Sequence, residues 1–240
     1  MVCISCMLDS MKYLTSIWAS FAIVFLIICV RIVDPQLLEQ LRLNTFDQYI
    51  QTLPEQKSED IVLINIGEES LETYGQFPWP RQEYAQMIYT LRNANAGMIV
   101  FTIMFPEEDR FNGDNTLAEY MDGNGVILAQ DADEYGRSKT APYVGYATFG
   151  PGDPMDFIYK YKGLVSNIDI LEEKAWGVGL VNGAPEVDNI TRRIPLVSQI
   201  NGQLYPSLAL ETVRVIQDKL SYTIKTTETG IESIVARPFE

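Results

Sequence analysis

The sequence predicts an α/β protein, in which a mixed, partly parallel sheet is flanked by helices and preceded by one N-terminal transmembrane helix. Three observations predict this class. An uncharged run lies near the N-terminus, and short apolar runs typical of buried strands then alternate with segments of helical spacing. Later in the chain, strand-like runs lie on both sides of the hairpin dipeptide Asn201-Gly202.

The uncharged run extends from Tyr13 to Val30, between Lys12 and Arg31. As a helix it would be roughly 27 Å long, close to the hydrocarbon thickness of a bilayer. A cleaved signal peptide is one alternative, but no small-x-small cleavage site follows the run. A buried core helix is the other alternative. We interpret the run as an uncleaved membrane anchor.

This interpretation divides the chain into three parts: a cytoplasmic N-terminus over 1–12, a transmembrane helix over 13–33 and an extracytoplasmic body over 34–240. Lys12 and the free amino terminus, against Arg31, favour this orientation. The body contains no cysteine, which is compatible with a periplasmic or extracellular location beside the inner membrane.

Composition excludes several classes of function. The formal net charge of −14 argues against a nucleic-acid partner, because phosphate binding needs a basic face. The chain has no histidine, which removes the commonest general base and the commonest zinc ligand. Residues 109–115 are acidic but lack the order of a calcium loop and are expected to form a solvated loop. No phosphate-binding or dinucleotide-binding glycine motif is present, so we expect no metal, no cofactor and no catalytic residue in this segment.

The first half of the body reads as alternating strands and helices. The predicted helices are 37–49, which continues out of the membrane, 68–74, 80–94, and one that begins at the capping box Thr116-Leu117-Ala118-Glu119. The predicted strands are 61–66, 98–105 and 125–130. Strand 61–66, helix 80–94 and strand 98–105 would form a right-handed βαβ unit.

The second half is richer in turns. The predicted strands are 143–149, 194–205 with a hairpin at Asn201-Gly202, 222–225 and 231–235. The predicted helices are 168–176 and one that opens at Pro206-Ser207. Because the last strand reads as cut off, we expect the chain to be part of a longer receptor.

The segment Gly75-Gln76-Phe77-Pro78-Trp79-Pro80-Arg81 is the most constrained in the sequence. Its two prolines fix the backbone on either side of Trp79, and Pro80 is suited to open the next helix. Trp79 therefore sits on a stiff corner, with Arg81 in the first helical turn. This arrangement predicts either a structural corner or one wall of a pocket.

Acidic residues follow both predicted early strands, with Glu68 after the first and Glu107 and Asp109 after the second. Ligands bind outside the carboxyl ends of strands in open parallel sheets, so these acids and the Trp79–Arg81 corner should converge. The candidate ligand-binding residues are Glu68, Ser70, Trp79, Arg81, Glu107 and Asp109. The alternative is that the acids cap helices and pair with Arg81.

The order of motifs resembles the type-two family of CHASE sensory domains over roughly residues 42–215. The matching motifs are Asp47-x-Tyr49, Glu68-x-Ser70-Leu71, Trp79-Pro80-Arg81, Phe101-x-x-x-Phe105-x-Glu107-x-Asp109, Gly177-x-Gly179-x-x-Asn182, Asp188-x-x-x-Arg192-x-Ile194-Pro195-Leu196 and Tyr205-Pro206-Ser207-Leu208-Ala209-Leu210-Glu211. Two departures stand out: Phe101-Thr102 where the family often has Phe-Asp, and Glu186-Val187-Asp188-Asn189 where it usually has Asp-x-Asp-Gly.

The resemblance implies the extracytoplasmic input domain of a bacterial transmembrane receptor. Such domains usually precede a cytoplasmic adenylate or diguanylate cyclase, histidine kinase or serine/threonine kinase. The implied partners are the membrane and an unidentified small ligand or environmental stimulus, with a homodimer possible. The alternatives are a membrane-anchored binding protein or carboxylate-dependent enzyme, and a purely structural or dimerisation module.

Overall fold

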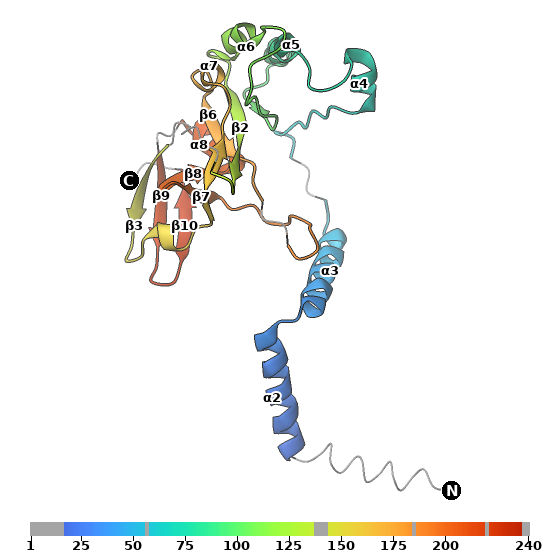
Figure 1. Ribbon diagram of the computed structural model, residues 1–240, viewed down its shortest axis with the longest axis vertical. Coiled ribbons are helices and arrows are strands. Elements are labelled where there is room, and N and C mark those ends of the chain that lie inside the picture. The colour runs from blue at the N-terminus through green and yellow to red at the C-terminus, as the bar shows by residue number, and fades with distance from the viewer. Residues whose placement is uncertain (1–16, 56–57, 137–143, 184–185, 219–220, 237–240) are drawn as a thin grey trace, which may run out of the picture. The chain divides into compact units, whose positions relative to one another are not determined.

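A computed structural model of the chain describes residues 17–55, 58–136, 144–183, 186–218 and 221–236. The described chain divides into two compact units. The first contains residues 17–63 and the turn at 186–190, and the second contains the remaining residues. Figure 1 shows the described chain and labels most of its helices and strands.

The first unit is helical. Helix α2 (Ile17–Val33) and helix α3 (Gln36–Thr52) follow the apolar run and the predicted 37–49 helix. The chain bends between them at Asp34, which has a positive φ of 44° and accepts a hydrogen bond from Arg31 at 2.7 Å. Pro35 then caps α3 in extended conformation. Both helices are therefore present as predicted, within the residues that the structure describes.

The length and hydropathy of these helices do not by themselves identify a membrane span. Within the described residues, no single helix is both long and apolar enough to cross a bilayer. The pair Trp18–Val33 and Gln36–Thr52 meets that requirement only when taken together, and it is bent by 85°. Residues 13–16 of the predicted 13–33 span lie outside the described part.

The predicted strand at 61–66 is wrong. This segment is extended but pairs with no strand of the described chain, and Ile61, Val62 and Leu63 are 76%, 82% and 89% exposed. An apolar run indicates that burial is favourable, but a strand also needs a neighbour for its backbone N–H and C=O groups. Only Ile66, at the end of the run, packs against a core. The predicted βαβ unit is therefore not formed.

The second unit is built on β2, the longest strand. The sheet around it contains β1 (Ile99–Phe101), β2 (Val126–Asp133), β5 (Gly163–Val165) and β6 (Gly177–Leu180). Strands β1 and β6 pair with β2 in parallel on opposite edges, and β5 pairs antiparallel with its carboxyl end. The mixed α/β class is thus confirmed, but β1 stops four residues before the predicted end of its strand.

Helices cover both faces of this sheet. The helices of the second unit are α4 (Glu68–Tyr74), α5 (Arg81–Asn93), α6 (Asp114–Met121), α7 (Asp169–Glu172) and α8 (Leu208–Ile216). Successive β2 side chains point to opposite faces. Leu128 packs with Tyr84, Ile88, Leu117 and Leu171 of helices α5 to α7.

The opposite face of β2 meets α8. Ile127 and Ala129 pack against Leu208, the first residue of that helix. Ser207 caps α8 as predicted, since its hydroxyl oxygen accepts the Leu210 amide at 3.2 Å. Figure 1 shows α8 beside β6.

The Gly-x-Gly motif of β6 lets α8 approach closely. Gly177 and Gly179 are two residues apart and so face the same side. A Cβ built on Gly179 would lie 2.5 Å from the Leu208 Cα and 2.7 Å from its N. One on Gly177 would lie 2.4 Å from the Glu211 carboxylate. Both glycines are required because the helix backbone and a buried acid occupy the space of a side chain.

Replacing Gly179 with alanine is expected to lower the free energy of unfolding by about 3 kcal/mol, because a backbone and not a flexible side chain must move. Gly145→Ala is the matched control, since a Cβ there meets nothing within 4 Å. Chemical denaturation of both variants measures the difference. Equal stabilities would contradict this account of the motif.

Two further sheets complete the second unit, so the described residues form three sheets and not the single predicted sheet. Their elements are β3 (Gly145–Phe149), β9 (Ser221–Thr226) and β10 (Ile231–Val235) in one sheet, and β4 (Lys160–Tyr161), β7 (Val197–Ile200) and β8 (Gln203–Pro206) in the other, with a short 3-10 helix at Pro154–Asp156. The predicted hairpin is confirmed: Asn201 and Gly202 have φ of 49° and 76° between β7 and β8.

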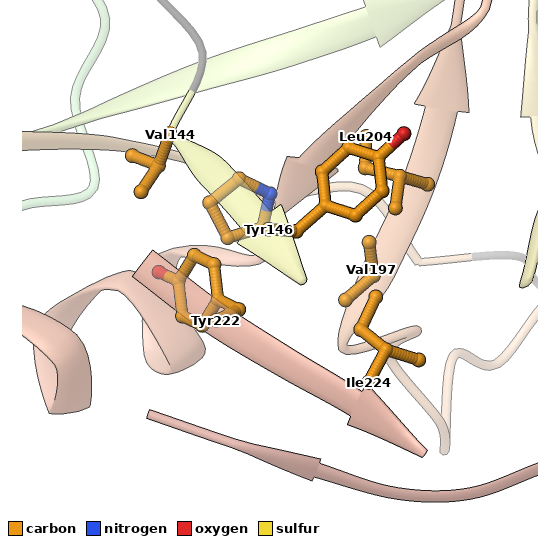
Figure 2. Close-up of a pocket in the computed structure, with 7 residues that line it drawn as sticks. Val144, Tyr146, Val197, Leu204, Tyr222 and Ile224 are labelled. Carbon is orange, nitrogen blue, oxygen red and sulfur yellow. The ribbon is translucent and has the colours of Figure 1, made fainter. Parts of the chain in front are cut away.

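These two sheets share an apolar core. Figure 2 shows side chains from β7, β8, β9 and the β3 region gathered around a small void, among them Tyr146, Val197 and Ile224. The void has a volume of about 10 Å³, which is room for one water molecule at most. It is a packing defect of the core and not a ligand site.

A buried ionic cluster joins α8 to β9. Glu211 is 0% exposed, and its carboxylate accepts hydrogen bonds from Arg214 at 2.6 and 2.9 Å and from the Tyr222 hydroxyl. Arg214 also donates to the Trp176 carbonyl at 3.3 Å. The charge of Glu211 is therefore balanced within the fold, as a buried carboxylate requires.

The same cluster predicts a loss of stability in alkali. Burial, followed by the neighbouring Glu211 carboxylate, raises the pKa of Tyr222 above its usual value. In the unfolded chain the pKa of the Tyr222 hydroxyl is near 10. The stabilisation that the buried Tyr222 provides is therefore complete below that pH, and it falls as the pH rises further. We expect Tyr222 to account for a loss of about 1 kcal/mol between roughly pH 10 and 11.

Denaturation at both pH values, for the wild type and for Tyr222→Phe, measures this contribution. The variant should be less stable at neutral pH but should lose less on going to alkali. Burial also raises the pKa values of Tyr84 and Tyr161, so some pH dependence remains in the variant. An identical pH dependence in both proteins would contradict the assignment to Tyr222.

Candidate functional site

The constrained corner begins where α4 ends. Gly75 has a positive φ of 85°, which favours glycine, and its amide donates to the Leu71 carbonyl at 2.9 Å. The Phe77–Pro78 peptide bond is cis. Pro80 is the N-cap of α5, which begins at Arg81, one residue after the predicted start. The corner therefore leads the chain from α4 into α5.

Trp79 is a core residue at this corner. Its side chain is 4% exposed, and its indole Nε1 donates to the Gly75 carbonyl at 2.8 Å. Its ring lies 5.3 Å from that of Tyr74 and 6.4 Å from that of Tyr84, measured between centroids. These contacts are those of a structural corner, which was one of the two predicted alternatives; the other was the wall of a pocket.

Arg81 connects α5 to the segment that follows β1. Its Nε donates to Asp114 Oδ1 at 3.2 Å, and its Nη2 donates to the Glu107 carbonyl oxygen at 2.8 Å. The guanidinium carbon lies 4.6 Å above the centre of the Phe105 ring. Arg81 is 8% exposed, so this planar group is held in one orientation within a mostly dry environment.

Two aspartates complete what we call the Arg81 network: Arg81, Asp109, Asp114 and the Glu107 carbonyl. Asp109 Oδ2 accepts the Gly113 amide at 2.9 Å and the Arg81 amide at 3.4 Å. Asp114 Oδ2 accepts the Asp109 amide at 2.8 Å. Residues 109–113 therefore form a hydrogen-bonded turn into α6 in which Arg110, Phe111 and Asn112 are exposed, in agreement with the predicted solvated loop.

The start of α6 also differs from prediction. The helix begins at Asp114, two residues before the predicted capping box at Thr116. The residue before it, Gly113, has no side chain to cap the helix, and its amide is satisfied by Asp109 instead. A negative charge in the first helical turn is favourable, and Asp114 provides it.

A hollow of about 370 Å³ lies beside this network, at the carboxyl end of β1. It is lined by Phe77 and Pro78, by Arg81 and Tyr84 of α5, and by residues 102–106. Apolar side chains make up most of its wall. Its volume falls at the lower end of the range of roughly 300–1,000 Å³ typical of small-molecule sites. It is far larger than the void of about 10 Å³ between the two smaller sheets.

Tyr84 lies at the buried side of the hollow. The residue is 0% exposed, and its hydroxyl has no partner at hydrogen-bond geometry among the described residues. Burial raises the pKa of this phenol, and the Trp79 backbone and the Arg81 charge oppose the rise only in part. The hydroxyl is thus neutral and able to donate a hydrogen bond.

Asn167 fixes the floor of the hollow. Its Oδ1 accepts the Phe105 amide at 2.7 Å, and its Nδ2 donates to the Ala129 carbonyl at 2.9 Å. The Phe105 carbonyl accepts the Ile168 amide at 2.9 Å. Both backbone groups of Phe105 are therefore tied to the segment before α7, so the hollow has a rigid wall.

The structure brings together only some of the predicted site residues. Arg81 and Asp109 belong to the network, while Glu107 contributes its backbone carbonyl and leaves its side chain exposed. Glu68 is exposed in the first turn of α4 and Ser70 is half-buried in the same helix, and neither enters the Arg81 network.

Sequence reasoning missed Tyr84, Asp114 and Asn167. Tyr84 was recognised only as one apolar position of a helix. Asp114 lies 33 residues from Arg81, and Asn167 lies 62 residues from Phe105, so no local pattern indicates either contact. The available signal was topological, because the carboxyl end of a parallel strand is where such side chains meet.

Comparison with known proteins identifies the family. A model of the CHASE2 domain matches residues 22–238. CHASE2 domains are extracellular sensory domains, which agrees with the resemblance in the sequence motifs. No curated protein matches the chain, and no solved structure matches it. Since the family match covers most of its length, the chain belongs to the CHASE2 domain family.

Proposed function

We propose that this chain is the extracytoplasmic input domain of a transmembrane signalling receptor, which passes an external stimulus to a cytoplasmic cyclase or kinase. The observation that carries the proposal is the CHASE2 match over residues 22–238, because that family is one of extracellular sensors. The Arg81-lined hollow supports a role in binding, since it combines apolar walls with few, fixed polar groups.

The proposal includes a membrane anchor at the N-terminus. The uncharged run between Lys12 and Arg31, much of which forms α2, supports it by length and composition. Most of the exposed side chains of this helix are apolar, among them Phe21, Phe25 and Ile32. Large apolar surfaces of this kind mark sites that contact another apolar medium, and lipid is the medium proposed here.

Alkaline carbonate extraction tests the anchor. The full chain should remain in the membrane pellet. The double variant Phe25→Arg and Ile28→Arg should appear in the soluble fraction, because each charge near a helix centre disfavours insertion by about 2.5–3.5 kcal/mol. Leu38→Arg and Leu41→Arg in α3 form the matched control and should stay in the pellet. A soluble wild-type chain would contradict the anchor.

A further inference from the structure

Two features of the hollow beside Arg81 indicate which kind of ligand it could bind. They are the hydrogen-bond donors that line it and the charged groups around those donors. The Nε and Nη2 of Arg81 donate hydrogen bonds to Asp114 and to the Glu107 carbonyl, whereas Nη1 donates none within the described chain. A guanidinium has five N–H donors, so Arg81 retains donors that its structural bonds do not use. The Tyr84 hydroxyl is closed to solvent and does not reach the hollow. The unused donors of Arg81 call for a ligand that accepts hydrogen bonds.

The surrounding charge decides which kind of acceptor is suitable. Asp109 and Asp114 both contact Arg81, so two carboxylates outnumber the one cation at this site. The side chains of Glu107 and Glu108 add further negative charge in the same segment. An anionic ligand would be repelled by these acids. A cationic ligand that approached the Arg81 donors would be repelled by the guanidinium charge. A neutral hydrogen-bond acceptor is repelled neither by the carboxylates nor by Arg81.

The walls set the size and the apolar character. The hollow of about 370 Å³ is lined by Phe77, Ile103, Met104 and Phe105, in addition to Arg81 and the Tyr84 ring. Because Arg81 already covers the Phe105 ring, that face is not available to a second cation. The remaining apolar surface suits a single aromatic ring or a compact aliphatic group.

We infer that the hollow binds a neutral, single-ring molecule that carries a carbonyl group, with the carbonyl oxygen accepting a hydrogen bond from Arg81. This inference rests on the proposed function, because it names the class of ligand that the sensory domain would detect. The ring occupies the apolar part of the hollow, and the carbonyl faces Arg81.

Three molecules of one size and different charge test the inference. Benzamide is neutral with a carbonyl, benzoate is its anionic counterpart, and benzylamine is the cationic one. Saturation-transfer NMR titrations on the full chain in nanodiscs, corrected with empty nanodiscs, give the dissociation constants. Benzamide is expected to bind about tenfold more tightly than either charged molecule, a difference of about 1.4 kcal/mol.

Variants locate the site. Thr102 lines the hollow and is exposed, so Thr102→Phe should fill the space and abolish benzamide binding while the chain stays folded. Thr90→Phe, on the exposed side of α5, is the matched control and should bind normally.

Several results would overturn the inference: tighter binding of benzoate or benzylamine, no binding of any of the three, or binding unaffected by Thr102→Phe. None of these would contradict the proposed function, which depends on the side of the membrane that the body occupies. A body found in the cytoplasm would contradict the function even if benzamide binds as expected.

Discussion

Replacing Glu211 with alanine is expected to lower the free energy of unfolding by about 4 kcal/mol. The carboxylate is fully buried and accepts hydrogen bonds from Arg214 and Tyr222. Its removal leaves a mostly buried guanidinium and a buried phenol without their acceptor, and it opens the space that Gly177 leaves for it. Breaking one side of a buried pair is costly for this reason.

The matched control is Glu232→Ala. Glu232 also pairs with a cation, Lys225 at 2.8 Å, but both side chains are about half exposed. Exposed ion pairs contribute roughly 0–1 kcal/mol, so this variant should be nearly as stable as the wild type. Urea denaturation at neutral pH compares the two. Equal losses would mean that the buried cluster adds no more than a surface pair.

Arg81→Met is expected to lower the free energy of unfolding by about 3 kcal/mol. Methionine retains the apolar stem but removes the donors to Asp114 and the Glu107 carbonyl, as well as the cation above Phe105. Asp114 is slightly exposed, so water compensates for part of its lost partner and the effect is smaller than at Glu211.

Arg110→Met is the matched control for this variant. Arg110 is exposed and lies 5.9 Å from the Phe111 ring, so its removal should change stability by less than about 1 kcal/mol. Thermal and urea denaturation of the two variants measure the difference. A stable Arg81→Met protein would show that the network does not hold α5 to α6.

Local signals in the sequence predict well where helices begin and end and where the hairpin turn lies. Gly75 ends α4, Pro80 precedes α5, Ser207 caps α8, and Asn201-Gly202 forms the hairpin. In each case the deciding interaction lies within a few residues, or the residue's own backbone preference decides it.

The failures have non-local causes. The apolar run at 61–66 has the composition of a strand but no pairing partner, and pairing cannot be read from composition. The capping box at Thr116 is overridden because Asp109 and Arg81 organise the helix start from outside the helix. Within the candidate site, charge and rigid prolines indicated Arg81, whereas Tyr84 and Asn167 depend on contacts that only the fold creates.

The most direct test of the central claim is the location of the body relative to the membrane. Because residues 34–240 contain no cysteine, a single one can be introduced by Glu228→Cys, in the exposed turn between β9 and β10, with Cys3, Cys6 and Cys29 replaced by serine. A second protein keeps Cys3 and Cys6 and carries only Cys29→Ser. Intact cells are treated with a membrane-impermeant maleimide.

We predict that the Glu228→Cys protein is labelled in intact cells, and that the protein retaining Cys3 and Cys6 is labelled only after the membrane is permeabilised. That result would place the body outside the cytoplasm and residues 1–12 inside it. Labelling of Cys3 and Cys6 in intact cells, with Glu228→Cys protected until permeabilisation, would contradict the assignment of this chain as an extracytoplasmic sensor.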